Sequence, residues 1–358
     1  MSPFPAFPTS RSTAALFAAA LAFAASPTHA QSHVVDVDDG VLVQPPSVAF
    51  PFYTPGGGVL GYTTRAQSFC PPTFAALQPL SRSLVTHVAL QLAGREVYDV
   101  FTLRAGATTV PALTHSFATN LPDQRPHVDL RGVTLEGGAV GGVPTNRWVT
   151  FALDRPFVWS PGEGVVVDVT AKIAFTDRYC TTGTSPNLQR LTDQDHRGGA
   201  TGTLQQSNGL KFRLVFEPLD VVRFGASCPG SGGGRPTLGS IGDATLGSTN
   251  YALTLTGALP NAPTALLFGA SRRSMAGGVA LPFAFGGGCE WQTSAEVALA
   301  VVVAGGAPGQ GTANAPLAIP NAPALQGEAF YVQWAQLDFA SVATVPVTTS
   351  EGGIVVIR

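Results

Sequence analysis

The amino-acid sequence predicts an all-β protein built from two antiparallel, jelly-roll-like β-sandwiches in tandem. Short apolar segments alternate with polar residues at a period of two, which is the pattern of strands with one buried face. Clusters of glycine and proline, which total 41 and 29 among the 358 residues, separate these segments. No amphipathic helix longer than about three turns stands between successive segments, so parallel β-α-β units are not expected.

The clearest expected strand spans residues 165–175, where the odd-numbered positions are apolar. Asp168 and Lys172 occupy the opposite face, so we expect this strand to have one buried side and one side in solvent. Residues 211–217 repeat the pattern, and the only lysines of the chain, Lys172 and Lys211, are both expected on outward faces. Other strands of this half are expected at residues 84–92, 98–103, 128–135 and 148–153.

A change in composition near residue 220 predicts a boundary between two domains. Lysine is absent after Lys211, and a run rich in glycine begins at Cys228. We therefore expect an extended segment or linker at residues 31–61, a first β-sandwich domain at 62–219 and a C-terminal β-sandwich module at 220–358. Strands of the second half are expected at residues 251–256, 265–268, 297–303, 329–333 and 354–357.

Residues 1–30 have the layout of a secretory signal peptide. Arg11 supplies a positive charge, residues 14–25 are an uninterrupted apolar run, and residues 26–30 are mostly small or helix-breaking. The alternative, a transmembrane anchor, needs about 20 apolar residues, and this run has about a dozen. We expect cleavage after Ala30 and a protein that is secreted or located at the cell surface, with no membrane span.

Cys70, Cys180, Cys228 and Cys289 are expected to form two disulfides, because an exported protein folds in an oxidising compartment. Four cysteines allow three pairings. We favour Cys70–Cys180 and Cys228–Cys289, since each pair then stays within one expected domain. No Cys-x-x-Cys pair occurs, so a zinc site or a thioredoxin-like redox pair has no support.

Glycine, proline and cysteine have a distinctive spacing at residues 225–233, 259–263 and 286–289. This spacing resembles a C-terminal module that recurs in large secreted proteins of planctomycete-type bacteria. In the first half, residues 156–162 and 164–169 resemble the jelly-roll-like domain that often precedes this module. The family is largely uncharacterised, so the resemblance implies the fold and export and transfers no catalytic residue.

The sequence contains no local motif for catalysis or nucleotide binding. Gly56, Gly58 and Gly61 satisfy Gly-x-Gly-x-x-Gly but open no helix, so the phosphate-binding geometry is missing. Residues 225–229 fail as a serine-hydrolase elbow, because proline replaces the last glycine. The formal net charge of −2 gives no electrostatic attraction to nucleic acid, which we do not expect as a partner.

Asp193 and Asp195 are the candidate metal ligands, because closely spaced carboxylates on a polar loop suit a structural Ca²⁺ ion. The alternative is a turn in which the Asp side chain accepts backbone N–H groups beside a glycine. Apart from this calcium ion, we expect no cofactor.

Trp159 and Trp291 are the candidate ligand-binding residues, because one lies next to a Pro-Gly turn and the other follows Cys289. An exposed tryptophan offers a sugar ring an apolar face and a polar tip. The alternative for each ring is packing in the core, which we expect for Trp148 and Trp334.

Two classes of function stay open. The first is an exported, non-catalytic extracellular or cell-surface β-sandwich protein that binds carbohydrate or another envelope component, and the missing catalytic motifs favour it. The alternative is a secreted glycoside or ester hydrolase whose site is assembled from distant loops, as a Ser-His-Asp triad is. A glycosidase would need two carboxylates about 5–9.5 Å apart. A pocket with two facing carboxylates would favour the enzyme.

Overall fold

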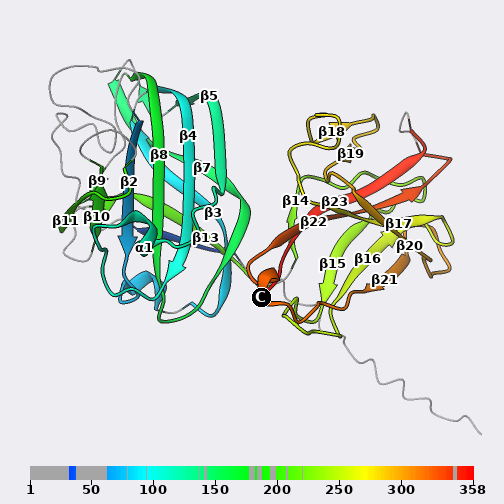
Figure 1. Ribbon diagram of the computed structural model, residues 1–358. Coiled ribbons are helices and arrows are strands. Elements are labelled where there is room, and N and C mark those ends of the chain that lie inside the picture. The colour runs from blue at the N-terminus through cyan, green and yellow to red at the C-terminus, as the bar shows by residue number, and fades with distance from the viewer. Residues whose placement is uncertain are drawn as a thin grey trace, which may run out of the picture. The chain divides into compact units, whose positions relative to one another are not determined.

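The computed structural model describes residues 32–37, 63–78, 80–93, 95–136, 138–140, 143–176, 182–183, 188–193, 199–206, 209–219, 221–341 and 345–358. Within these residues the chain is nearly all β, and its strands form antiparallel sheets (Figure 1). The predicted all-β, sandwich-type fold is therefore confirmed. No helix among the described residues has the length and hydropathy needed to cross a membrane.

The first sandwich has the strand order of a jelly roll. One sheet has the order β1-β13-β3-β7, with the short β6 paired to both β3 and β7, and the other has the order β2-β8-β4-β5, extended beyond β2 by β10 and β11. Most successive strands of the two four-stranded orders change sheets, and β4 and β5 stay in one sheet, as in the two Greek keys of a jelly roll. The elements are β1 (His33–Val37), β2 (Thr63–Cys70), η1 (Ala75–Leu77), β3 (Ser83–Ala93), β4 (Arg95–Thr108), α1 (Phe117–Asn120), β5 (Val128–Glu136), β6 (Gly138–Val140), β7 (Val143–Trp159), β8 (Gly164–Thr176), β9 (Thr182–Gly183), β10 (Gln189–Thr192), β11 (Thr203–Gln206), β12 (Gly209–Leu210) and β13 (Phe212–Glu217).

Side chains from both sheets fill the space between them. Phe101 of β4 stacks on Phe151 of β7 with ring centroids 5.0 Å apart, and Val167 and Phe212 are fully buried in the same cluster. The first strand, β1, pairs with β13 over its whole length. The first sandwich thus begins at His33, within the segment that the sequence analysis places in a linker; the rest of that segment and the expected signal peptide lie outside the described residues.

Around Asp168, the outer face of β2, β8 and β4 is also covered, which corrects the expectation of a solvent-facing side at this position of β8, whereas the side chain of Lys172 is 41% exposed, as expected. The segment between β4 and β5 carries α1, and its Phe117 packs on Val166 and Phe69. Asp168 is consequently fully buried. Its Oδ2 accepts hydrogen bonds from Arg65 Nη2 at 2.6 Å and from Gln67 Nε2 at 2.7 Å.

Replacement of Asp168 by asparagine is expected to lower the free energy of unfolding by about 3 kcal/mol, because Arg65, whose side chain is only 12% exposed, would lose its fully buried counter-charge. Urea denaturation measures the change. The matched control is Asp129→Asn, whose ion pair with Arg131 is exposed, and it should change stability by less than about 0.5 kcal/mol. Equal losses in the two variants would contradict a special role for the buried pair.

The second sandwich packs a five-stranded sheet against a three-stranded one. The orders are β14-β23-β22-β17-β20 and β15-β16-β21, an arrangement similar to that of immunoglobulin-like sandwiches. Trp334 lies in its core, as expected, and Nε1 donates to the carbonyl of Thr254 at 3.0 Å. The elements are β14 (Val222–Phe224), β15 (Thr237–Ile241), β16 (Ala252–Ala258), β17 (Thr264–Gly269), β18 (Phe283–Ala284), β19 (Glu290–Trp291), β20 (Val297–Val301), β21 (Gly311–Pro316), η2 (Pro323–Leu325), β22 (Ala329–Leu337) and β23 (Val347–Val356).

No described strand pairs across residues 218–221, so the two sets of sheets separate close to the expected boundary; two independent domains stay a prediction. Apolar side chains from both sides nevertheless form one cluster. Leu84 and Val158 of the first sandwich pack with Tyr331 and Ile354 of the second. This cluster borders the site that is described below.

One of the two predicted disulfides is present. Cys228 and Cys289 are bonded, and they join the start of the second sandwich to the residue before β19. Cys70 is a buried free thiol whose pKa is raised by burial, so the predicted Cys70–Cys180 bond is wrong for this structure. The physical reason lies in β2, which directs Cys70 into the apolar core. Cys180 itself lies outside the described residues.

Candidate functional site

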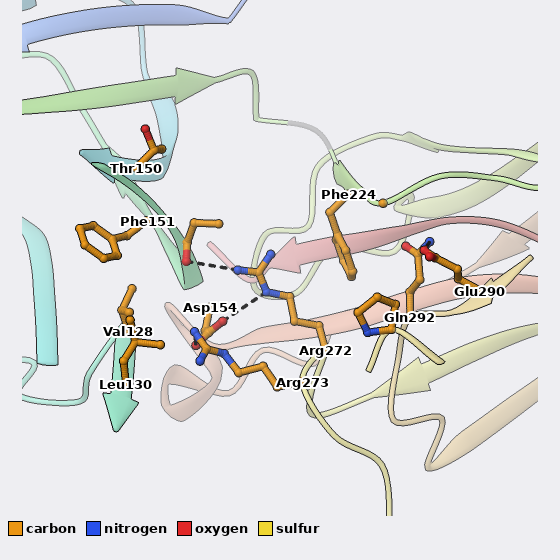
Figure 2. A pocket seen from close by; sticks show the side chains of 13 residues that line it. Val128, Leu130, Thr150, Phe151, Asp154, Phe224, Arg272, Arg273, Glu290 and Gln292 are labelled. Atoms are coloured by element: carbon orange, nitrogen blue, oxygen red, sulfur yellow. Dashed lines mark hydrogen bonds and ion pairs between the residues drawn. The ribbon is translucent and has the colours of Figure 1, made fainter. Parts of the chain in front are cut away.

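A pocket of about 510 Å³ combines apolar walls with a group of charged and amide side chains (Figure 2). Residues of β5 and β7 form one side of it, and the second sandwich forms the other. The apolar lining comes from Val128, Leu130, Phe151, Ala152, Phe224, Gly225 and Pro282, and the polar lining comes from Thr150, Asp154, Arg272, Arg273, Glu290 and Gln292.

Asp154 is the centre of an ion-pair cluster in this pocket. Its Oδ1 lies 3.2 Å from Arg272 Nε, and its Oδ2 lies 2.7 Å from Arg273 Nη2. Arg272 also donates to the backbone carbonyl of Ala152 at 3.2 Å, and the hydroxyl of Tyr331 donates to the backbone carbonyl of Asp154. Three residues of the second sandwich therefore bind one short segment of β7.

An irregularity in β7 places Asp154 in this position. Opposite β3, the pairing moves from His87 with Ala152 to Val85 with Phe157, so the residues between them leave the ladder. Pro156 lies in this segment and has no N–H to donate to a ladder, as is typical of prolines at bulges. The backbone N–H of Asp154 donates instead to the carbonyl of His127 at 2.9 Å.

The turn after β17 presents Arg272 and Arg273. The hydroxyl of Ser271 accepts hydrogen bonds from the backbone N–H groups of Arg273 and Ser274, at 3.0 and 3.2 Å. The guanidinium of Arg272 lies over the ring of Phe224, 5.4 Å from its centroid, which adds a cation–π contact. Both arginines are thus held before any ligand arrives.

Glu290 and Gln292 are positioned by hydrogen bonds next to the disulfide. The carbonyl of Glu290 accepts from Gln333 Nε2 at 2.9 Å. The amide of Gln292 accepts from the backbone N–H of Gly352 at 2.8 Å and donates to a carbonyl at 3.0 Å. Gly225 has φ +68°, and a Cβ there would lie 2.2 Å from Gln292 Oε1, so the site requires a glycine at this position.

Both carboxylate oxygens of Asp154 are engaged by arginines, so Asp154 is held as an ion pair. In Figure 2, Arg272 and Phe224 lie between Asp154 and Glu290. No serine–histidine pair lines the pocket within the described part of the chain.

The candidate metal ligands are only partly described. Asp193 is buried, and its Oδ2 accepts the backbone N–H of Gly199 at 2.8 Å. The residues between Asp193 and Gly199 lie outside the described part of the chain, so the capped turn, which is the alternative to a metal site, also stays a prediction. Asp195 lies outside the described residues, so a calcium ion at this loop stays a prediction. Among the described residues, no group of three or more His, Cys, Asp or Glu side chains is arranged to bind a metal.

The prediction of an exposed stacking ring at Trp159 is wrong. Trp159 is 1% exposed, packs edge-on against Phe216 at 5.5 Å and donates from Nε1 to the carbonyl of Glu163. It occupies the last position of β7, where the alternation of the strand turns its ring into the core. Trp291 is half-buried against Phe285; its two neighbours in sequence line the pocket, and its own ring does not.

The pocket residues themselves were missed by the sequence analysis. Two local signals were present. Asp154 precedes an Arg-Pro pair that interrupts a strand pattern, and Arg272-Arg273 is the only Arg-Arg pair in the chain. Neither signal shows that these residues meet, because they are more than a hundred positions apart in the sequence.

Comparisons with known proteins assign no family. No protein-family model matches the chain, and no curated protein matches it in sequence. The resemblance to planctomycete-type secreted proteins therefore stays a prediction.

A second hollow, of about 330 Å³, lies beside His127. His127 is 3% exposed, and its Nδ1 contacts the carbonyl of Arg155. Burial, assisted by the charge of Arg155, lowers the pKa of His127 from 6.5 to about 4. The folded protein therefore holds this imidazole neutral at a pH where the unfolded chain protonates it.

The free energy of unfolding is expected to fall as the pH drops from 6.5 towards 4, because the unfolded state then binds a proton that the folded state does not. The full loss at His127 is on the order of 3 kcal/mol. Chemical denaturation at a series of pH values measures it. His127→Gln should flatten this slope, and His115→Gln, at an exposed position, should leave it intact; an unchanged slope in the first variant would disprove the assignment.

Proposed function

We propose that this protein is an exported, non-catalytic binding module whose pocket around Asp154 takes a short, uncharged glycan. The observation that carries the proposal is the combination of apolar walls and pre-positioned planar polar side chains in one pocket. Ligand sites generally have this character, with mostly apolar walls and a few fixed polar groups, and the volume is within their usual range of about 300–1,000 Å³.

Sugar rings have apolar C–H faces and polar hydroxyl groups, and the lining of the pocket can bind both. Their C–H faces pack against apolar surfaces such as those of Leu130, Phe224 and Pro282. Their hydroxyl groups donate to carboxylates and accept from guanidinium groups, which give the stronger, charge-assisted hydrogen bonds. Glu290 supplies a carboxylate, and Arg273 supplies a guanidinium group.

The charge balance of the pocket favours a neutral ligand. Arg272 and Arg273 are offset by Asp154 and Glu290, and both arginines bind Asp154. A phosphate or an acidic sugar would have to compete with Asp154 for the same guanidinium groups. A neutral glycan needs no such exchange, because hydroxyl groups can use the donor and acceptor sites that remain.

Two separate observations support the proposed location of the protein outside the cell or at its surface. The Cys228–Cys289 disulfide is typical of proteins that fold in oxidising compartments. Together with the signal-peptide pattern of residues 1–30, it supports an extracellular or cell-surface location, with a glycan or another envelope component as the partner. The hydrolase alternative is less favoured, because Asp154 is not free to act as an acid, base or nucleophile.

The purified protein is expected to bind a subset of neutral glycans on an array without releasing product. Glu290→Gln and Arg273→Ala should each weaken binding of the best glycan about tenfold, because each leaves a ligand group without its partner. Titration calorimetry measures the change. Arg131→Ala, at an exposed residue of β5 that does not line the pocket, is the matched control and should bind normally.

Two results would overturn the proposal. One is the absence of any glycan binding by a protein that is folded by circular dichroism. The other is turnover of a glycan or ester substrate that is abolished by a single substitution in the pocket, which would favour the hydrolase.

A further inference from the structure

The strand β20 is an open edge of the second sandwich. It is the last strand in the order β14-β23-β22-β17-β20, and among the described strands it pairs only with β17 (Figure 1). Its pairing with β17 is regular, without a bulge. An open strand edge presents a row of unpaired N–H and C=O groups that another strand can bind.

This edge lacks the features that usually prevent pairing between molecules. Proteins protect open edges with charged side chains, prolines or bulges. β20 has none of these, and Val297 and Leu299 are 60% and 40% exposed. Val302, the residue after the strand, is 85% exposed. The opposite edge of the same sheet differs, since β14 carries Arg223 in an ion pair with Glu351.

The sequence of β20 also reads the same in both directions. Val297-Ala298-Leu299-Ala300-Val301 is a palindrome. If two copies pair antiparallel about a two-fold axis at Leu299, then each Val297 lies opposite a Val301, each Ala298 opposite an Ala300, and Leu299 opposite Leu299. Opposed β-branched and apolar side chains of this kind stabilise antiparallel pairs.

We infer that β20 pairs with β20 of a second copy of this chain, antiparallel and centred on Leu299. The symmetric contact is of the kind that closes a dimer, because it uses the β20 edge of both copies and leaves only the charged β14 edges at the ends of the joined sheet. The one acidic residue at the end of the strand fits this register. Glu296 would lie opposite Val302 of the other copy and away from the second Glu296.

Glu296 is in addition held away from the edge. Its Oε2 accepts the backbone N–H of Ala270 at 2.9 Å and the hydroxyl of Ser294 at 2.7 Å. Like charges therefore do not oppose the pairing. A strand pair this short buries less than the surface of a standard stable interface, so the dimer is reversible and depends on concentration.

Sedimentation equilibrium over a concentration series is expected to show the native protein exchanging between monomer and dimer. Leu299→Lys and Leu299→Glu should each be monomeric at every concentration, because identical charges would lie opposite each other at the two-fold axis. An equimolar mixture of the two variants should dimerise again, since lysine then faces glutamate. Only pairing of β20 with itself about Leu299 predicts this recovery.

Ile241→Lys is the matched control, because Ile241 is an exposed apolar residue, 56% accessible, on the edge strand β15 of the other sheet. This variant should dimerise as the native protein does. A native protein that stays monomeric at its highest soluble concentration would overturn the inference. So would dimers that persist in both charged variants, or a mixture that remains monomeric while each variant is folded by circular dichroism.

Discussion

Asp154 lies in the irregular segment of β7 and binds both arginines of the turn after β17 through its carboxylate, while its backbone carbonyl accepts the hydroxyl of Tyr331. These contacts hold the polar wall of the pocket against β5 and β7 of the first sandwich. Without them, Arg272 and Arg273 would carry unpaired charge next to the apolar cluster around Leu84 and Tyr331, which would cost free energy. The proposed binding site depends on this one carboxylate.

Inside each sandwich, too, buried polar groups are stabilised by polar partners. Only 12% of the residues are charged, and several of them are used as partners of buried polar groups. Asp168 is satisfied by Arg65 and Gln67 beneath the segment that carries α1. In the second sandwich, the buried side chain of Gln333 is fully hydrogen-bonded. It accepts the backbone N–H of Gln292 and donates to the carbonyls of Glu290 and Ser350. Buried polar groups that are fully hydrogen-bonded in this way specify one arrangement of the strands.

The strands that periodicity predicted all coincide with strands of the structure, because a period of two follows directly from the geometry of a strand with an apolar face. Other strands, such as β2, β15 and β21, were not predicted. Periodicity could not predict which segments of the chain cover the second face of a strand. Asp168 is buried because the segment before β5 folds over it, and Lys211, expected in solvent, is 1% exposed. The pocket was missed for the same reason, since its residues come from segments far apart in the sequence. The prediction for Trp159 was wrong for a local reason, because this residue still belongs to β7 and its ring follows the alternation of the strand into the core. The criterion that both cysteines belong to one half of the chain predicted the Cys228–Cys289 bond correctly, but it also predicted a Cys70–Cys180 bond, although Cys70 is a buried free thiol.

Hydrogen–deuterium exchange of the native protein and of Asp154→Asn tests most directly whether this carboxylate holds the site together. The substitution keeps the shape of the side chain and removes its charge. We expect faster exchange both in β7 around residue 154 and in the second sandwich, at the turn of Arg272 and Arg273 and at the start of β22. Faster exchange confined to β7, with the turn after β17 unchanged, would contradict the account.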